Sequence, residues 1–483
     1  MIITLICGGE RRVLEYSKET LLSRAIADAG VAVYAPCGGA GQCGRCRVMA
    51  SGALSQPDET ERMYLSDDEL AHGVRLACRA YALGECDITV DGMLPLQREI
   101  HASADKCVKL GLAADIGTTT VAVSLTDMET GRRVAEAAAY NPQAAWGADV
   151  ISRLGALSDV RTNTEEMSRI LHDCVSKLLA GSDLPTDTVV VGNTVMMSFW
   201  AGIDPTPIGR APFVPPTLFG YESGGIFLPR CVAGYFGADA MASVLASFED
   251  GGMERDFVLA DIGTNGEVAA WRGGRLYTCA AAAGPALEGA GITCGMAASE
   301  GAIDSVEIRA GRVSVHVIGE GRARGICGSG LIDAVACLLS LGVIDVDGHM
   351  AEPYELADGV IITPEDIRAL QLAKAAIRAA IETVMNTSLS HGETSFPTGT
   401  TLYLSGAFGA GLSVRSCVRI GLIPPSLAED VRILERGALR GAELMLVSRR
   451  ARELEEKIAA NAEYTELSGS EEFERRFISA MGF

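Results

Sequence analysis

The sequence predicts an α/β protein with a small N-terminal domain of the β-grasp type and a larger, duplicated α/β domain. Three observations carry this prediction. The first 95 residues place short apolar strands and two helices around a loop rich in glycine and cysteine. From residue 110 to about residue 450, apolar strands alternate with glycine- and alanine-rich segments. Within that stretch the pentapeptide Ala-Asp-Ile-Gly-Thr at 114–118 recurs at 260–264, which indicates an internal repeat.

The N-terminal elements follow from hydrophobic periodicity and from turn residues. Gly8-Gly9 separates two short apolar runs, as the turn of a hairpin does. The predicted strands are residues 2–6, 13–16, 47–50 and 86–90. The predicted helices are residues 20–29 and residues 66–78, the second with Ser66 and Glu69 in the positions of a capping box. Two hairpin strands, a helix and returning strands are the order expected for a β-grasp.

The larger domain is predicted from what surrounds the repeated pentapeptide. Each copy follows one apolar strand and precedes another, so two halves open with the same strand–turn–strand unit. A duplicated fold with a cleft between its halves is therefore expected. The apolar run at 334–344 is broken by Gly342 and is predicted to be a buried helix. Residues 451–483 are highly charged and are predicted to form a solvated helical element.

Composition and charge exclude several classes of function. The 483 residues include 62 acidic and 41 basic side chains, a formal net charge of −21, which disfavours binding to nucleic acid or to anionic membrane surfaces. No uncharged apolar stretch reaches transmembrane length, and the N-terminus does not resemble a secretory signal. We therefore expect a cytoplasmic protein. Its 14 cysteines are then expected to be thiols or metal ligands instead of disulfides.

Four cysteines have the spacing of an iron–sulfur site. Cys37, Cys43 and Cys46 lie in one loop with five and then two residues between them, and Cys78 follows further along the chain. A 2Fe–2S cluster takes four thiolates, and glycines in such a loop allow backbone N–H groups to approach the cluster sulfides. The alternatives are zinc, which favours two Cys-x2-Cys pairs where this loop has one, or free thiols. The five-residue spacing resembles the ferredoxins related to adrenodoxin.

The repeated pentapeptide predicts a nucleotide site. Glycine lets backbone N–H groups approach phosphate oxygens, threonine hydroxyls add hydrogen-bond donors, and aspartate holds Mg²⁺ directly or through water. One copy alone is also an ordinary tight turn, but two copies in opposite halves resemble the two phosphate loops of the actin-like ATPase and sugar-kinase superfamily. The residues that this resemblance places at ATP and Mg²⁺ are Asp115, Gly117, Thr118, Thr119, Asp261, Gly263, Thr264 and Asn265.

Two further glycine-rich loops complete the resemblance to that superfamily. Gly406 and Ala407 lie in a loop that is similar to its adenosine loop. Gly328 and Ser329 open a predicted helix and either line the nucleotide pocket or form a plain helix entry. Asp261, Glu267 and Glu288 are the candidate catalytic residues, the two glutamates as alternatives for orienting the attacking water.

The combination of a 2Fe–2S domain with such an ATPase resembles the reductive activators of corrinoid proteins. The resemblance implies an N-terminal β-grasp 2Fe–2S ferredoxin domain followed by a duplicated actin-like ATPase (ASKHA) domain. The motifs that extend it are Asn141-Pro142-Gln143, Gly147-Ala148-Asp149-Val150, Val191-Gly192-Asn193-Thr194, Gly284-Pro285-Ala286-Leu287-Glu288-Gly289 and Cys294-Gly295-Met296. The expected boundaries are 1–95 for the ferredoxin-like domain, 96–109 for a linker, 110–250 and 251–450 for the two ATPase halves, and 451–483 for the C-terminal element.

This resemblance also implies a function. Activators of this kind return inactive cobalt(II) to cobalt(I) in a corrinoid methyltransferase system. A 2Fe–2S centre lies near roughly −400 mV, and each ~59 mV of a one-electron deficit costs about 1.4 kcal/mol, so ATP is expected to supply the difference. The implied partners are a corrinoid protein, an upstream electron donor and, as in the superfamily, a second copy in a homodimer.

Three alternatives remain open at this point. The first is an ATP-driven electron donor to another low-potential enzyme such as an iron–sulfur dehydratase. The second is a small-molecule kinase with a redox-sensing domain, and the third is a redox switch that binds ATP without turning it over. Activators of dehydratases usually hold their cluster between ATPase subunits, whereas this chain carries a separate cluster domain.

Overall fold

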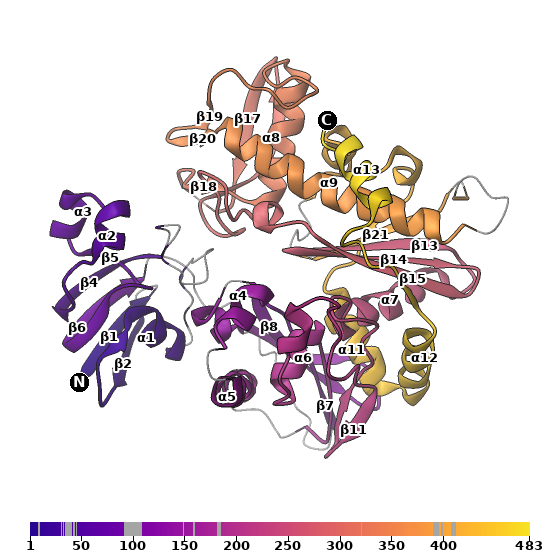
Figure 1. Ribbon diagram of the computed structural model, residues 1–483, viewed down its shortest axis with the longest axis horizontal. Coiled ribbons are helices and arrows are strands. Elements are labelled where there is room, and N and C mark those ends of the chain that lie inside the picture. Colours follow the sequence, from indigo (N-terminus) through magenta and orange to yellow (C-terminus); the bar gives the residue numbers. More distant parts are fainter. Residues whose placement is uncertain are drawn as a thin grey trace. The chain divides into compact units, whose positions relative to one another are not determined.

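A computed structural model describes the chain (Figure 1) except for residues 8–9, 30, 32, 34–40, 42–43, 45, 91–108, 148, 158–159, 181–184, 320, 390–395, 398 and 407–411. The chain forms two compact units. Unit 1 comprises Met1–Asp239 with Ala442–Arg450, and unit 2 comprises Ala240–Gly441 with Ala451–Phe483. Within the described ranges, no helix combines the length and the apolar character that crossing a membrane requires.

Unit 1 begins with the N-terminal sheet, whose strand order is β2-β1-β6-β4-β5 with β3 added beside β6. Its elements are β1 (Ile2–Cys7), β2 (Glu10–Glu15), β3 (Thr20–Leu21), α1 (Leu22–Asp28), β4 (Arg47–Leu54), α2 (Glu59–Tyr64), α3 (Asp67–Ala71), β5 (Val74–Leu76) and β6 (Tyr81–Val90). β1 pairs antiparallel with β2 and parallel with β6. The β-grasp prediction, with its N-terminal hairpin, is confirmed.

The predicted helix over residues 66–78 is wrong beyond its first turns. Ser66 and Glu69 do form the capping box, but α3 ends at Ala71. Gly73 follows with a φ of +85°, a left-handed conformation that ends a helix. The next residues, Val74–Leu76, pair with β4 as strand β5. The pairing partner lies some 25 residues earlier in the chain, so periodicity within 66–78 does not reveal it.

The second sheet of unit 1 has the order β11-β12-β10-β7-β8-β9. Its strands are β7 (Leu110–Ile116), β8 (Thr120–Asp127), β9 (Arg133–Tyr140), β10 (Asp187–Gly192), β11 (Tyr221–Ser223) and β12 (Ile226–Leu228). The helical elements of this part are η1 (Pro142–Ala145), α4 (Val150–Gly155), α5 (Val160–Leu178), α6 (Thr194–Trp200) and η2 (Thr206–Gly209). β10 runs parallel to β7, so both strands end at the same edge of the sheet.

Unit 2 is built on a sheet of order β22-β21-β13-β14-β15-β23. Its strands are β13 (Phe257–Ile262), β14 (Asn265–Arg272), β15 (Arg275–Ala282), β21 (Thr401–Gly406), β22 (Val431–Ile433) and β23 (Glu463–Tyr464). The helix α9 (Pro364–Thr387) covers one face, where Gly266 is pressed against Ile377. The helix α7 (Ala238–Gly251) covers the other, where Ser243 reaches Asp261 and Phe248 packs edge-on against Trp271.

The remaining elements of unit 2 form a smaller lobe and a C-terminal segment. The lobe contains η3 (Pro285–Glu288), β16 (Ala302–Arg309), β17 (Arg312–Val317), β18 (Gly325–Ile326), α8 (Gly328–Ser340), β19 (Tyr354–Ala357) and β20 (Val360–Ile362). The later helical elements are α10 (Val414–Arg419), η5 (Pro425–Leu427), α11 (Gly437–Val447, which continues into unit 1), α12 (Arg449–Ala460) and α13 (Glu471–Ser479). The buried helix expected in the 334–344 run is α8, which is almost wholly enclosed.

The two large sheets confirm the predicted duplication. The order β12-β10-β7-β8-β9 in unit 1 matches β22-β21-β13-β14-β15 in unit 2, with the same parallel and antiparallel pairs. In each unit the repeated pentapeptide ends the first strand of the repeat. Ile116 pairs there with Gly192, and Ile262 pairs with Gly406. In each unit, two parallel strands therefore end side by side at one edge of the sheet.

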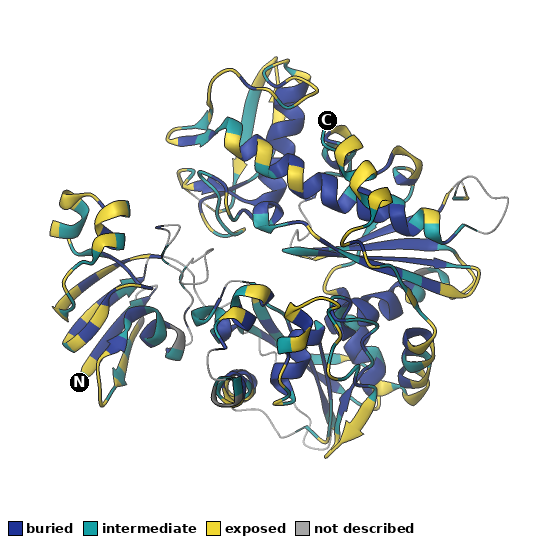
Figure 2. Ribbon diagram, in the orientation of Figure 1, coloured by how far each residue is buried: buried dark blue, intermediate teal, exposed yellow. Residues whose placement is uncertain are grey.

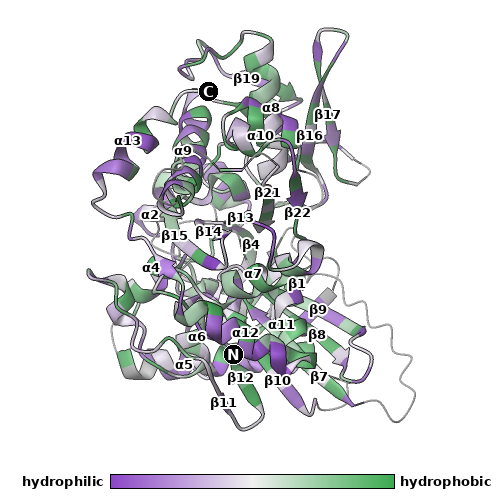
Figure 3. Cartoon of the chain, turned by 90° about the vertical axis from the view of Figure 1, so that its right-hand side faces the viewer, coloured by the Kyte–Doolittle hydropathy of each residue, from purple (hydrophilic) through white to green (hydrophobic). Residues whose placement is uncertain are grey.

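Burial follows the two sheets and the helices that cover them. Figure 2 shows α8 and the strands β13, β14 and β15 largely in dark blue. Figure 3 shows hydrophilic colour along α12, whose sequence is rich in arginine and glutamate. The expectation of a purely solvated C-terminal element needs correction, because α13 packs on α9 with Phe473 and Phe477 against the core of unit 2. These two phenylalanines share one face of the helix, and the charged residues cover the other.

Candidate functional site

The structure brings together two of the four predicted cluster ligands. Cys46 precedes β4 and Cys78 follows β5, and both thiols are buried. The backbone N–H of Cys78 donates to Sγ of Cys46 at 3.5 Å. Hydrogen bonding to Cys78 lowers the pKa of the Cys46 thiol to about 7, against the opposing effect of burial. Cys37 and Cys43 lie outside the described residues.

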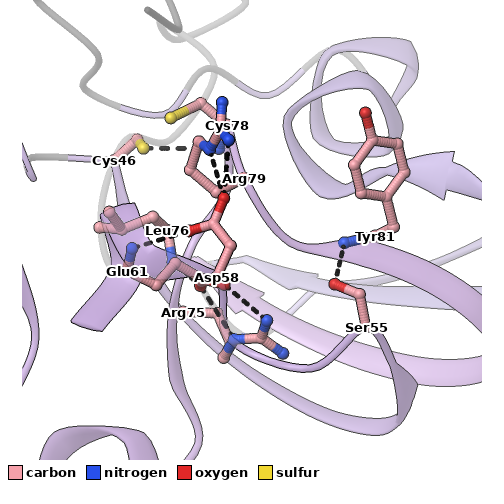
Figure 4. A network of polar contacts seen from close by, with 9 residues as sticks. All are labelled: Cys46, Ser55, Asp58, Glu61, Arg75, Leu76, Cys78, Arg79 and Tyr81. Carbon is pink, nitrogen blue, oxygen red and sulfur yellow. Dashed lines mark hydrogen bonds and ion pairs between the residues drawn. The ribbon is translucent and has the colours of Figure 1, made fainter. Parts of the chain in front are cut away.

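A buried ion pair fixes the strand that leads to Cys78 (Figure 4). Arg75 donates through Nε and Nη2 to the two carboxylate oxygens of Glu61, at 2.9 and 2.7 Å. The backbone N–H of Leu76 donates to the same carboxylate at 2.9 Å. Glu61 is 0% exposed and belongs to α2, so the pair fastens this short helix to β5. Sequence reasoning did not single out either residue.

A second ion pair lies directly beside Cys78. Asp58 caps α2 by accepting from the backbone N–H of Glu61 at 2.8 Å, and its other oxygen accepts from Nε of Arg79 at 2.7 Å. Figure 4 shows Arg79 next to Cys78, with Asp58 below it. The Asp58 carboxylate raises the pKa of Arg79, so the guanidinium next to the cysteine remains charged.

These residues fit a 2Fe–2S cluster. Two buried sulfur donors lie together, one with a lowered pKa and an N–H group aimed at its sulfur, as thiolate ligation favours. Gly44, between the predicted ligands, has a φ of +63°, and a Cβ there would lie 2.7 Å from the Tyr64 side chain. Elsewhere in the described ranges, no group of three or more His, Cys, Asp or Glu side chains is arranged to hold a metal ion.

The first copy of the pentapeptide ends in repeat turn 1, defined as residues 117–119. Asn141 donates through Nδ2 to the carbonyl oxygen of Gly117 at 2.8 Å. Asn193 donates through Nδ2 to the hydroxyl of Thr118 at 2.9 Å. Arg153 donates to the carbonyl oxygen of Thr118 at 2.5 Å. Polar side chains from three later segments therefore hold this turn.

The two asparagines have a second contact that fixes their orientation. Asn141 caps η1, where its Oδ1 accepts from the backbone N–H of Gln143 at 2.9 Å. Asn193 caps α6 in the same way, with Met196 as the donor at 3.0 Å. Each amide thus caps a helix with its oxygen and holds repeat turn 1 with its nitrogen. Both lie in motifs noted in the sequence, but without the tertiary contact no role could be assigned.

The second copy ends in repeat turn 2, defined as residues 263–264. The hydroxyl of Thr264 donates to Oε2 of Glu288 at 2.9 Å. Asp261, the last acidic residue before this turn, accepts from Ser243 at 3.5 Å and is hydrogen-bonded to Ser405. Burial raises the pKa values of both carboxyls, and the Asp261 charge adds to the rise at Glu288. Glu267 lies opposite Asp261 in the β13–β14 register, and Asn265 begins β14.

The other predicted nucleotide residues differ in their surroundings. Gly406 has a φ of +109° and ends β21 beside Ile262, where a Cβ would overlap the Ile262 carbonyl oxygen. Ala407 lies outside the described residues. Gly328 is pressed against the carbonyl of Leu287, next to Glu288. Ser329 is buried, and its hydroxyl donates to the Asp304 carbonyl at 2.9 Å, so this hydroxyl holds the entry of α8 to β16.

Comparisons with known sequence families match three consecutive parts of the chain. Residues 5–83 match a 2Fe-2S iron-sulfur cluster binding domain. Residues 110–250 match the RACo middle region. Residues 256–483 match the C-terminal domain of RACo, the ASKHA domain.

Individual relatives agree with these domain matches. The chain is 31% identical over 388 residues to the corrinoid activation enzyme RamQ of Eubacterium limosum, a match that covers 70% of the chain and 64% of RamQ. The chain thus spans less than two thirds of that relative. It is 26% identical over 432 residues to a [Co(II) methylated amine-specific corrinoid protein] reductase of Methanosarcina barkeri, which covers 77% of each chain.

One solved structure is similar over the whole chain. It is described as a reductive activator for a corrinoid, iron-sulfur protein and superposes with a TM-score of 0.67 at 26% sequence identity. The match covers 100% of this chain and 98% of that one. The similarity therefore extends over both the cluster domain and the ASKHA domain.

Proposed function

Because residues 110–250 and 256–483 match the middle region and the C-terminal ASKHA domain of RACo, we propose that the chain is an ATP-dependent reductive activator of a corrinoid protein, which returns cobalt(II) to cobalt(I) by adding one electron. The observation that carries the proposal is the presence in one chain of two features. One is a buried cysteine pair suited to a 2Fe–2S cluster, and the other is a duplicated sheet in which an aspartate precedes each threonine-bearing repeat turn. The names of the similar proteins support the choice of a corrinoid partner.

The N-terminal domain is assigned the electron-carrying role. Cys46 and Cys78 hold the cluster together with Cys37 and Cys43, and the bound cluster supplies a one-electron carrier. The ion pairs Glu61–Arg75 and Asp58–Arg79 position Cys78 and fix the charges around it. An upstream reductant delivers the electron to this domain, and the corrinoid protein receives it.

The duplicated α/β part of the chain, residues 110–450, is assigned the role of binding the nucleotide. In repeat turn 1, backbone N–H groups and the hydroxyls of Thr118 and Thr119 bind phosphate, with Gly117 allowing close approach. Repeat turn 2 contributes Gly263 and Thr264, and Asn265 follows it at the start of β14. Asp115 and Asp261 hold Mg²⁺ directly or through water. Gly406 and Ala407 accommodate the adenosine, and Gly328 with Ser329 shapes the wall beside Glu288. ATP binding drives the transfer by favouring one conformation of the chain over another.

Glu288 is the better candidate than Glu267 for orienting the attacking water. Its carboxylate is held by Thr264 of repeat turn 2 at 2.9 Å. Its raised pKa also reflects the charge on Asp261, which places the two carboxyls within electrostatic reach of each other. A carboxyl with a raised pKa is a stronger base once ionised, which suits proton acceptance from water. Glu267 lies on β14, opposite Asp261 in the register.

The test is an anaerobic assay with three components. The chain with its cluster reconstituted is reduced, mixed with a cobalt(II) corrinoid protein, and followed by visible spectroscopy with and without Mg-ATP. Growth of the cobalt(I) band only with Mg-ATP is expected. Asp261→Ala should abolish it while leaving the iron–sulfur absorption intact. Asp358→Ala is the matched control, because that side chain is 92% exposed on the surface of unit 2.

Two outcomes would contradict the proposal. If cobalt(I) forms equally well without nucleotide, the ATPase is not coupled to the reduction. If no corrinoid protein is reduced while a small molecule is phosphorylated stoichiometrically, the chain is a kinase with a redox domain. Nucleotide-dependent reduction of an iron–sulfur dehydratase instead would keep the architecture and change the acceptor.

A further inference from the structure

Arg153 is a fully enclosed guanidinium next to repeat turn 1. It lies in the short helix α4 and is 0% exposed. Its Nε donates to the Gly147 carbonyl at 2.9 Å, and Nη1 donates to Oε1 of Gln143 at 3.1 Å. Its Nη2 donates to the Thr118 carbonyl at 2.5 Å. No role for this residue follows from the motifs of the sequence.

Among the described residues, the hydrogen-bond acceptors around this guanidinium are neutral. They are two carbonyl oxygens, one amide oxygen and the sulfur of Met196 at 3.3 Å. The carboxylate of Asp149, which caps α4, accepts from the N–H and hydroxyl of Ser152 and acts on Arg153 only through its charge, which partly offsets the effect of burial. Burial lowers the pKa of Arg153 to about 9, so the side chain is still protonated at pH 7. A buried charge is normally balanced by an ion-pair partner, because desolvating it alone is costly.

The second copy of the repeat holds its turn with an uncharged donor. The carbonyl of Thr264 corresponds in the repeat to that of Thr118. It is held by the backbone N–H of Gly284 at 2.9 Å, a neutral donor. Repeat turn 1 is one residue longer between its paired strands, and its last carbonyl, that of Thr119, is likewise held by a backbone N–H, from Asn141 at 2.8 Å. The guanidinium contact to the Thr118 carbonyl is therefore an additional contact in unit 1. The charge in unit 1 calls for a separate explanation.

Peptide planarity shows where repeat turn 1 directs its donors. In a trans peptide the C=O and the following N–H point in opposite directions. The carbonyls of Gly117 and Thr118 point toward Asn141 and Arg153, so the N–H groups of Thr118 and Thr119 point away from these interior side chains. Thr119 is exposed. Successive outward N–H groups form a concavity that suits an anion.

The threonine hydroxyls of the two turns have opposite hydrogen-bonding roles. The Thr118 hydroxyl accepts from Asn193, which leaves its proton free to donate to a ligand. The Thr264 hydroxyl donates to the Glu288 carboxylate, which leaves its lone pairs free to accept. Repeat turn 1 is thus rich in donors with a cation behind it. Repeat turn 2 is rich in acceptors with carboxylates beside it.

We propose that Arg153 is a positioning residue for the phosphates of a nucleoside triphosphate, whose negative charge balances the buried guanidinium. It acts through the Thr118 peptide, which it holds and polarises, and it does not touch the ligand. The proposal rests on the proposed nucleotide site and deepens it, since it makes phosphate binding at repeat turn 1 depend on a buried cation behind the turn.

The test measures equilibrium binding of Mg-ATP and of adenosine to the whole chain. Arg153→Gln keeps hydrogen-bonding capacity without charge, and Arg153→Lys keeps the charge. Mg-ATP affinity is expected to fall about 10- to 100-fold in the Gln variant, the loss of a charge-assisted contact, and less in the Lys variant. Adenosine, which lacks phosphate, should bind as in the wild type. Arg169→Gln is the matched arginine control, because Arg169 lies on α5 with its side chain 59% exposed and pairs with carboxylates at the surface.

A second variant keeps the test valid if removal of Arg153 prevents folding. Gln143→Glu places a carboxylate where Oε1 now lies 3.1 Å from the guanidinium, which gives Arg153 an internal partner. It gives up one donor bond to the Met167 carbonyl. The new carboxylate competes with phosphate for the charge of Arg153, so the affinity for Mg-ATP is expected to fall roughly tenfold, the factor that corresponds to one pK unit. The affinity for adenosine should not change.

The outcomes separate this inference from the proposed function. If the wild-type chain fails to bind Mg-ATP, the nucleotide site itself is wrong. Two results with a wild type that binds Mg-ATP would show that the charge on Arg153 has no role in phosphate binding. One is equal Mg-ATP affinity in Arg153→Gln and Arg153→Lys. The other is an unchanged Mg-ATP affinity in Gln143→Glu. A lower melting temperature with unchanged affinity assigns Arg153 to stability alone and overturns the inference.

Discussion

Glu61 and Arg75 form a two-bond ion pair that is enclosed in the N-terminal domain, with side-chain exposures of 0% and 6%. The pair connects α2 to β5, the strand that ends two residues before Cys78. The Glu61 carboxylate also accepts from the Leu76 N–H. One side chain of α2 therefore holds both a side chain and the backbone of β5. The position of a predicted cluster ligand thus depends on a charge pair in the core.

Removing one partner of this pair should destabilise the domain strongly. Glu61→Gln leaves the Arg75 guanidinium buried without its anion, which typically costs about 3–5 kcal/mol. Denaturant unfolding followed by circular dichroism and by the visible iron–sulfur absorption measures the loss. Asp87→Asn is the control, because the exposed pair Arg11–Asp87 at 4.0 Å should contribute less than about 1 kcal/mol. Equal effects in the two variants would contradict the structural role of Glu61.

The cysteine assignment predicts a selective loss of the cluster. Cys46→Ser and Cys78→Ser should lower the iron content and remove the visible absorption, because a serine hydroxyl is a much poorer ligand for iron than a thiolate. The same result is expected for Cys37→Ser and Cys43→Ser. Cys86→Ala, which changes a buried cysteine on β6 of the same domain, should keep the cluster. A normal spectrum in Cys78→Ser would remove this residue from the ligand set.

Glu288→Gln should lower ATP turnover by roughly 10²- to 10⁴-fold, the usual effect of losing a general base. Burial raises the Glu288 pKa above its ordinary range, so wild-type turnover should fall as the pH decreases through that raised value and the carboxylate is protonated. The variant should lack this limb of the pH profile. A larger loss in Glu267→Gln than in Glu288→Gln would reverse the assignment.

The same pKa shift predicts an effect of opposite sign on stability. A carboxyl whose pKa is higher in the folded than in the unfolded chain opposes folding above the folded pKa, and its cost disappears below the unfolded pKa. Glu288→Gln should therefore raise the melting temperature of the nucleotide-free chain at pH 7, and the gain should shrink as the pH falls toward 4. Thermal melts of both proteins across this range test the sign. A variant less stable at pH 7 would indicate that the Thr264 contact outweighs desolvation.

Gly406→Ala should impair nucleotide binding through the backbone. The φ of +109° is strained for any residue with a Cβ, and that atom would overlap the Ile262 carbonyl directly before repeat turn 2. A loss of more than about 1 kcal/mol in stability and a clear rise in KM for ATP are expected. Gly359→Ala separates the two causes, because Gly359 has a φ of +81° but open space around it. Matching effects in both variants would exclude the overlap as the cause.

The pattern of apolar and turn residues in the sequence was sufficient to predict much of the architecture. Gly8-Gly9 and the flanking apolar runs predicted the hairpin, and two copies of Ala-Asp-Ile-Gly-Thr predicted two equivalent sheets. Such features are local, because turn residues and strand periodicity act within a few neighbours. The end of α3 was missed because the competing strand pairing lies some 25 residues away in β4.

What the sequence by itself determined is the set of reactive groups: four spaced cysteines, two Asp-Ile-Gly-Thr turns and the order of the domains that carry them. Only the tertiary structure decided what holds those groups and how the two copies differ. The Glu61–Arg75 pair, the amides of Asn141 and Asn193, and Arg153 behind Thr118 are polar contacts between distant segments. The physical reason is that a buried polar group must find a partner, and which segment supplies it depends on how sheets and helices pack, not on spacing along the chain.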